Sequence, residues 1–160
     1  TLFPYTTLFR SSTHQEPNSL AEQKECEMEL DGQALMKIDV KSKEFNFGDM
    51  YKYSTESKTL WISNNLKTAI HIRIEPDIEP LSQSYPKTIV IVPGNTEAFI
   101  ITMHSKYEQR INYFLKYTIN YSQTFRLKIT ANIVPPTLHI IKPLVKFDFK
   151  KECMMHYLMN

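Results

Sequence analysis

The chain has 160 residues, 42% of them hydrophobic and 12% aromatic, which is enough for one domain with a substantial core and flanking segments. Its net charge of +2 conceals an acidic stretch at residues 16–31, with six acidic side chains against one lysine, and a basic remainder, with sixteen Lys/Arg against nine Asp/Glu over residues 41–151. The basic residues are scattered and no run of eighteen apolar residues occurs, so we expect neither a nucleic-acid partner nor a membrane-spanning helix.

The N-terminal third of the chain begins with two segments that differ from the rest. Residues 1–11 resemble the in-frame translation of a common sequencing-library adapter, and we exclude them from fold reasoning as a non-native artefact. Residues 12–33 are acidic and poorly periodic, which predicts a linker with a short helical turn near residues 20–28. Cys26 and Cys153 are 127 positions apart and lie outside the strongest strand pattern, which argues against a disulfide and favours a reducing, cytoplasmic compartment.

Strand-like alternation begins at residue 35 and continues for about 100 residues, with turns every eight to twelve or so. Only three glycines are present, so most turns must use proline, asparagine, serine and aspartate; Gly48-Asp49 is expected to close the second strand. The spacing predicts an all-β fold, an immunoglobulin-like antiparallel β-sandwich of seven or eight strands over residues 34–136. The expected strands cover residues 35–40, 44–47, 58–64, 70–75, 88–92, 96–104, 111–121 and 125–133.

Residues 111–134 have the clearest pattern, because apolar and polar side chains alternate on both sides of a Ser-Gln-Thr corner. We expect a β-hairpin whose apolar face is covered by a second sheet. Phe114 departs from the pattern, since it lies on the polar face beside Lys116 and across from Arg126 or Lys128. An aromatic side chain among cations on a sheet surface predicts a protein-contact site formed by these four residues. The alternative is that a loop or a neighbouring domain covers Phe114.

The strand pattern restarts after the Pro-Pro pair at residues 135–136. Residues 138–149 echo residues 35–47, and the two F-x-F pairs lie 102 residues apart, which is one domain length. We therefore expect a tandem array in which residues 137–160 are the truncated start of a second immunoglobulin-like copy. Neighbouring repeats of the same chain would then be contact partners.

Residue types that could support catalysis or metal binding are present but isolated. Histidines lie singly along the expected strands, and Cys153-x-x-His156 has the spacing of half a zinc site without a second half. P-loop, G-x-G-x-x-G and G-x-S-x-G motifs do not occur, so we expect no enzymatic activity, no cofactor and no metal. Residues 120–122 form a glycosylation sequon that matters only in a secreted protein, and Trp61 is interpreted as a core residue or an inter-domain contact.

Four short motifs, in their order and spacing, resemble the hydin-type module. This is the abnormal-spindle/hydin branch of the major-sperm-protein and PapD-like immunoglobulin folds, found in tandem in large cilia- and flagella-associated proteins. The resemblance covers about residues 35–149. The motifs are F-N-F-G-D at residues 45–49, L-W-I-S-N at 60–64, I-V-P-G-N at 91–95 and A-N-I-V-P-P at 131–136.

The resemblance implies a non-enzymatic scaffolding module in the axoneme of a cilium or flagellum, of the kind associated with the central apparatus. It implies axonemal or cytoskeletal protein partners, microtubule-associated ones among them, and provides no catalytic residues. Two alternatives stay open from the sequence. One is a secreted or cell-surface immunoglobulin-like adhesion domain, and the other is a major-sperm-type adaptor that binds acidic peptides in a basic groove.

Overall fold

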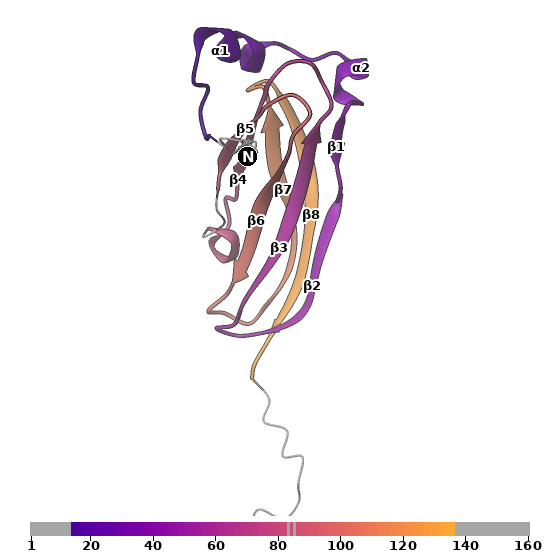
Figure 1. Ribbon diagram of the computed structural model, residues 1–160. Helices are drawn as coiled ribbons and strands as arrows, with labels where there is room; N and C mark the ends of the chain where they lie inside the picture. Colours follow the sequence, from indigo (N-terminus) through magenta and orange to yellow (C-terminus); the bar gives the residue numbers. More distant parts are fainter. Residues whose placement is uncertain (1–13, 83, 85, 137–160) are drawn as a thin grey trace, which may run out of the picture.

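The computed structural model describes residues 14–136 except residues 83 and 85. In this part of the chain, eight strands form two sheets that pack face to face, and the two short α-helices lie at one end of the sandwich (Figure 1). The predicted all-β sandwich is confirmed. The elements are α1 (Leu20–Glu27), α2 (Gly32–Leu35), β1 (Ile38–Val40), β2 (Glu44–Tyr51), β3 (Thr55–Asn64), β4 (Ile70–Glu75), the 3-10 helix η1 (Glu79–Leu81), β5 (Thr88–Ile91), β6 (Thr96–His104), β7 (Gln109–Ile119) and β8 (Gln123–Val134).

The two sheets contain three and five of the described strands, in the orders β1-β3-β6 and β2-β8-β7-β4-β5. All pairs are antiparallel except β2 with β8, which is parallel and departs from the purely antiparallel sandwich that we expected. The reason is visible in Figure 1, where the chain passes from β1 to β2 without reversing its direction. Only residues 41–43 separate these two strands, so the chain changes sheets through a short crossover at the edge of the sandwich.

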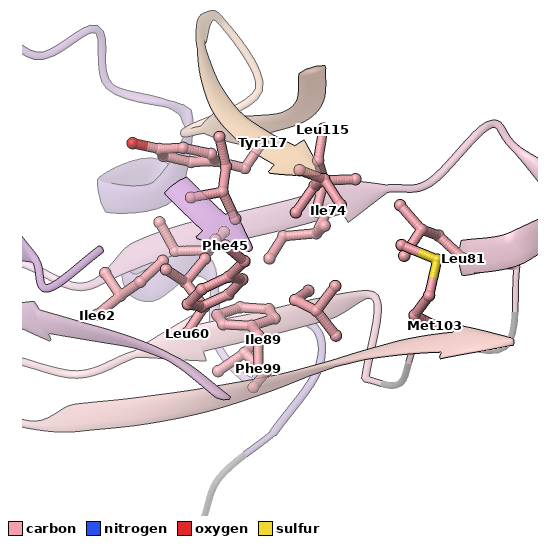
Figure 2. Packing of buried hydrophobic residues seen from close by; sticks show 14 of the residues in the cluster. Phe45, Leu60, Ile62, Ile74, Leu81, Ile89, Phe99, Met103, Leu115 and Tyr117 are labelled. Carbon is pink, nitrogen blue, oxygen red and sulfur yellow. The ribbon is translucent and has the colours of Figure 1, made fainter. Parts of the chain in front are cut away.

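The core lies between the sheets and is built from alternate residues of each strand, as the period-two pattern predicts. Figure 2 shows Phe45 and Leu115 from the five-stranded sheet packed toward Leu60 and Phe99 from the three-stranded sheet. Leu60, Phe99 and Leu115 are completely buried. Burial of each side chain of this kind stabilises the fold by about 1.5–3 kcal/mol. Because this burial occurs between the sheets, each sheet depends on the other for its stability.

The predicted hairpin is confirmed as β7 and β8, which pair without interruption from Gln109 opposite Ile133 to Ile119 opposite Gln123. The sequence pattern extended the first strand to Tyr121, whereas the strand ends at Ile119. Asn120 and Tyr121 both have positive φ, 49° and 59°, which matches the right-handed twist of a tight hairpin connection. Asparagine tolerates this left-handed conformation better than most residues.

Strand β2 continues past the point where the sequence predicted its end. Gly48 has a φ of 66°, and the pairing of β2 with β8 shifts between Asn46 and Asp49, which is the signature of a β-bulge. The side-chain oxygen of Asn46 accepts a hydrogen bond from the Gly48 amide at 2.8 Å and supports the bulge. Gly48 therefore bends the strand, which continues to Tyr51.

Residues 14–30, which we call the strap, pack onto the outer face of the five-stranded sheet near β4 and β5 (Figure 1). The predicted helical turn is helix α1, whose first turn is capped by the Ser19 hydroxyl accepting from the Glu22 amide. The next turn, α2, occupies residues where the first strand was expected to begin, because the Asp31 carboxylate caps it through the Ala34 amide. Strand β1 consequently begins only at Ile38.

Segments outside the strands form hydrogen bonds with some of the backbone groups at the sheet edges. The Ser84 hydroxyl accepts from the Thr102 amide at 3.0 Å, on the free edge of β6. The Val90 amide of β5 donates to the His14 carbonyl at 2.9 Å, so the strap covers part of the β5 edge. These contacts reduce the number of exposed backbone groups available for unwanted strand pairing. The predicted second copy over residues 137–160 and the adapter-like residues 1–11 lie outside the described residues.

Candidate protein-contact site

The four residues of the predicted contact site lie together on the outer face of the five-stranded sheet. Phe114 of β7 is directly opposite Lys128 of β8, and Lys116 is directly opposite Arg126. Phe114 is 50% exposed, so no described loop covers it. We call these four residues the Phe114 patch. The structure brings them together as two adjacent cross-strand pairs, as hairpin register requires.

Of the three basic side chains in the Phe114 patch, one has an acidic partner among the described residues and two do not. The Lys128 ammonium lies 3.9 Å from a Glu44 carboxylate oxygen of β2, and an exposed pair of this kind contributes about 0–1 kcal/mol. Lys116 lies between Glu75 of β4 and Arg126 of β8. Neither Lys116 nor Arg126 forms an ion pair with another described residue. Two like charges directly opposite each other repel, so an acidic side chain of a partner would be attracted between them.

An open hollow of about 310 Å³ adjoins the patch, toward the end of the sheet where β8 finishes. Its lining includes the outward side chains of Asn112 and Thr130, which face each other one step along from the Phe114 pair. Gly48 also lines it, at the bulge of β2. The remaining lining residues are Asn46, Arg110, Ile111, Ala131 and Asn132.

The sequence analysis did not identify this hollow. A weak signal existed in Asn46, Asn112 and Asn132, which are polar amides at outward positions of three different strands. Their alignment depends on the parallel pairing of β2 with β8 and on the bulge, and neither feature is readable from alternation alone. The amides and the Arg110 guanidinium offer hydrogen-bond donors and acceptors to an incoming side chain beside Phe114.

A second hollow, of about 280 Å³, lies between β1 and the hairpin. Its apolar lining includes Ile38, Tyr117 and Phe125, and the last two rings stack at 5.5 Å between centroids. Burial raises the pKa of Tyr117, in keeping with a phenol that lies mostly inside. The hollow forms because β2 joins β8 only from Lys128 onward, which leaves the first part of β8 without a neighbouring strand on that side.

The outer face of the three-stranded sheet is chemically different. Trp61 and Ile100 are both 46% exposed there, so the interpretation of Trp61 as a core residue is wrong. The ten outward positions of β3 and β6 carry no Asp, Glu, Lys or Arg side chain. Those positions are Thr55, Ser57, Thr59, Trp61, Ser63, Thr96, Ala98, Ile100, Thr102 and His104. The two faces of the sandwich therefore offer partners opposite kinds of surface.

The sequon residue Asn120 is buried, with an exposed fraction of 1%. Its side-chain nitrogen donates to the carbonyls of Glu25 and Met28 in the strap at 3.2 and 2.9 Å, and its side-chain oxygen accepts from the His71 amide at 3.0 Å. A glycan on this nitrogen would remove one of its two N–H donors and so break at least one of the hydrogen bonds to the strap. The folded chain thus uses Asn120 as a structural residue.

The described residues contain no group of three or more metal-ligating side chains suited to hold a metal ion. The one cysteine in this part of the chain, Cys26, is free and fully buried. Burial, followed by the nearby carboxylates led by Glu22, raises its pKa to about 12, so its thiol is not a nucleophile in the folded protein. In the described part of the chain no helix is long and apolar enough to cross a membrane.

The fold and the family match define an immunoglobulin-like module of the protein-interaction class, whose members are typically non-catalytic. The chain belongs to the HYDIN/CFA65/VesB-like family of Ig-like domains, which matches residues 36–132. The resemblance to hydin-type modules found in the sequence is confirmed by this match. No curated protein matches the chain.

The sandwich is similar to many solved structures, among them a PapD-like domain and an MSP family member. The ASH/PapD-like domain 7 of human CEP192 is 11% identical, with a TM-score of 0.53, over 63% of this chain and 87% of that one. WR4, an MSP family member of C. elegans, is 9% identical, with a TM-score of 0.42, over 61% of this chain and 98% of that one. At 11% identity, the likeness to the CEP192 domain bears on the fold alone, which is PapD-like.

Proposed function

We propose that this chain is a non-enzymatic scaffolding module that makes protein–protein contacts in the axoneme of a cilium or flagellum, of the central-apparatus type. Family membership over residues 36–132 supports this role, together with the resemblance of four motifs to hydin-type modules. The proposed setting is cytoplasmic, inside the cilium. Its proposed partners are axonemal or cytoskeletal proteins, microtubule-associated ones among them, and neighbouring repeats of the same chain.

The Phe114 patch is the proposed contact site, and the half-exposed Phe114 ring is the observation that carries it. A large aromatic side chain that stays exposed on a rigid hairpin loses little conformational freedom when a partner covers it. Lys116 and Arg126 add positive charge that no described residue pairs with. The patch therefore fits a partner that presents an apolar pocket bordered by carboxylates, such as the acidic surface of a cytoskeletal polymer.

The proposed contact is tested by binding of the purified chain to isolated axonemes and to stabilised microtubules. Phe114→Ser should weaken binding at least tenfold, because an anchoring aromatic side chain is worth about 2 kcal/mol or more at an interface. The free energy of unfolding should change by less than about 0.5 kcal/mol, since Phe114 is exposed. Lys116→Glu, as a separate variant, should also weaken binding, because it puts a negative charge where the partner meets a positive one. The binding of this variant should depend less on the salt concentration.

Ile100→Ser is the matched control, because Ile100 is similarly exposed but lies on the opposite face of the sandwich. It should leave axoneme binding unchanged. Equal losses in both variants, or a several-degree fall in the melting temperature of Phe114→Ser, would contradict the proposed contact site. Unaltered binding of Phe114→Ser would do so as well.

A major-sperm-type adaptor that binds acidic peptides is the second candidate function. The observation in its favour is the hollow of about 310 Å³ beside the patch, which has Arg110 in its lining. This candidate predicts micromolar binding of short acidic peptides by the chain, with loss on Arg110→Glu, and no affinity for intact axonemes. The third possibility, a glycosylated adhesion domain, is disfavoured because Asn120 is buried and hydrogen-bonded through both ends of its amide.

A further inference from the structure

Among the described residues, His71 of β4 is the side chain with the most buried polar atoms that lack a hydrogen-bond partner. Its side chain is 1% exposed, and both ring nitrogens are buried without a hydrogen-bond partner. A buried imidazole nitrogen that makes no hydrogen bond is costly, and a buried imidazolium without a close partner costs more. The ring stacks on Tyr121 of the hairpin turn, with centroids 4.3 Å apart and planes within 13°.

Besides the Gln123 side chain, which donates to the Leu30 carbonyl, four contacts away from the ring hold the strap over it. The Val90 amide donates to the His14 carbonyl, and the Ala69 amide donates to the Glu25 carboxylate at 2.7 Å. Asn120 holds the end of α1 through the Glu25 and Met28 carbonyls. The fourth contact is apolar: Cys26 packs in a small buried cluster with Ala69 and Val90.

Few charges face the imidazole. The nearest is the Glu16 carboxylate of the strap, 3.7 Å from Nε2, and Glu16 is itself mostly exposed. Arg73 lies two residues along β4, and the Tyr121 phenol, whose pKa is raised first by burial and then by Glu16, lies on the turn. Helix α1 contributes the Cys26 thiol, which stays neutral, and three further carboxylates, those of Glu22, Glu25 and Glu27. Glu22 is occupied with His14 at 2.8 Å.

We propose that the strap is a proton-sensitive latch, closed over His71 while the imidazole is neutral and released when the imidazole gains a proton. Burial, as the largest effect, lowers the pKa of His71 below 6.5; Glu16 raises it less, and Arg73 lowers it slightly. With the strap open, the solvated ring returns to its ordinary value. The closed form therefore binds protons less readily than the open form, and acid favours opening.

The pH window follows from these two states. Above pH 6.5 the ring is neutral in both, and closure has its full stability. As the pH falls from 6.5 toward the lower value of the closed form, the equilibrium constant for opening rises by up to roughly tenfold per pH unit. Opening would free the Val90 and Ala69 amides and uncover the apolar cluster, which together form a surface on the β5 edge that another segment could pair with.

The Cys26 thiol gives a direct readout, because it is completely buried when the strap is closed. The full chain with Cys153→Ser is reacted with 4,4′-dithiodipyridine between about pH 7.5 and pH 5. The rate of glutathione with the same reagent corrects each rate for the pH dependence of the thiol itself. The corrected rate should rise severalfold below pH 6.5 in this chain and stay flat when His71→Phe is added, because phenylalanine keeps the stacked ring and cannot be protonated.

Glu16→Gln sharpens the test, since Glu16 favours the charged imidazole in the closed form. Its removal should lower the closed-form pKa of His71 further, so the rise in rate should continue to lower pH and become larger in total. A corrected rate that is independent of pH in the parent chain, or an equal rise in His71→Phe, would overturn the proposal.

If His71→Phe does not fold, the parent chain decides the question by proton NMR of the His71 ring and hydrogen exchange of the Val90 amide. A His71 midpoint below 6.5 with concurrent loss of Val90 protection supports the latch. A midpoint at or above 6.5, or constant Val90 protection, overturns it.

Discussion

Asn120 connects the hairpin turn to the strap through both ends of its side-chain amide. Two demands meet at this residue. The turn needs a residue that accepts a φ of 49°, and the buried His71 amide needs an acceptor, while the other end of the same side chain donates to the Glu25 and Met28 carbonyls. Asparagine satisfies both. The sequence shows only the sequon pattern at this position, because the partners lie 92 and 95 residues away and no local signal indicates them.

Asn120→Gly separates these two demands. Glycine adopts positive φ without strain, so the turn should persist, while the hydrogen bonds to the strap and to the His71 amide are lost. Leaving buried partners unsatisfied costs about 1–3 kcal/mol, and urea unfolding should show a loss in that range. Asn112→Ala, on the exposed outer face of β7, is the control and should change stability by less than about 0.5 kcal/mol. Equal effects of the two substitutions would contradict the structural role of Asn120.

At the scale of the element, alternation predicted the positions of most strands but not how they join. The hairpin, β3 and β6 follow their apolar periodicity closely, because each buries one face and exposes most of the other, and β4 does so except at His71, which the strap covers. Strand β2 extends past Gly48 because a bulge lets the chain bend and continue pairing with β8. A glycine near a strand end is equally consistent with a turn, so this distinction required the partner strand.

Alanine substitutions at two glycines measure the free energy that the positive φ of the bulge costs a residue with a side chain. Gly48 lies in the bulge and Gly32 does not. An added Cβ would meet no atom within 4 Å at either Gly48 or Gly32, so neither substitution by alanine creates a clash. Gly48 has a φ of 66°, and Gly48→Ala should destabilise the chain by about 1–2 kcal/mol through backbone strain alone. Gly32 begins helix α2 without positive φ, so Gly32→Ala should stabilise it by about 0.4–1 kcal/mol. Urea unfolding of both variants checks the opposite signs; a shared sign would contradict the assigned conformations.

At the scale of the whole molecule, the sandwich and its family were predictable from the sequence, and so was the position of the proposed contact residues on one outer face. Period-two alternation fixes which side chains point inward, and that pattern also placed Phe114 and its cationic neighbours on the outer face. The hollow beside Phe114 depends on the parallel pairing of β2 with β8. The docking of the strap depends on contacts made by single side chains, such as Glu25 with the Ala69 amide, which carry no periodic signal.

The strap also bears on where the folding unit begins, since the family match starts at residue 36 and the strap ends at residue 30. Removing residues 1–30 would expose Val90 and take Leu30 out of the core. Most of that burial is offset by the entropy of ordering the strap, so we expect a net loss of about 1–3 kcal/mol. The melting temperature should fall by roughly 4–8 °C for each kcal/mol lost.

Removing only residues 1–11 is the matched control, because their resemblance to a translated adapter predicts that they contribute nothing to the fold. In thermal unfolding, the chain without residues 1–11 should therefore have the same melting temperature as the full chain. The chain without residues 1–30 should melt well below both. If the chain without residues 1–30 melts at the same temperature as the full chain, the strap adds no stability. The sandwich would then be complete without it, and the folding unit would begin at the linker boundary that the sequence pattern predicts.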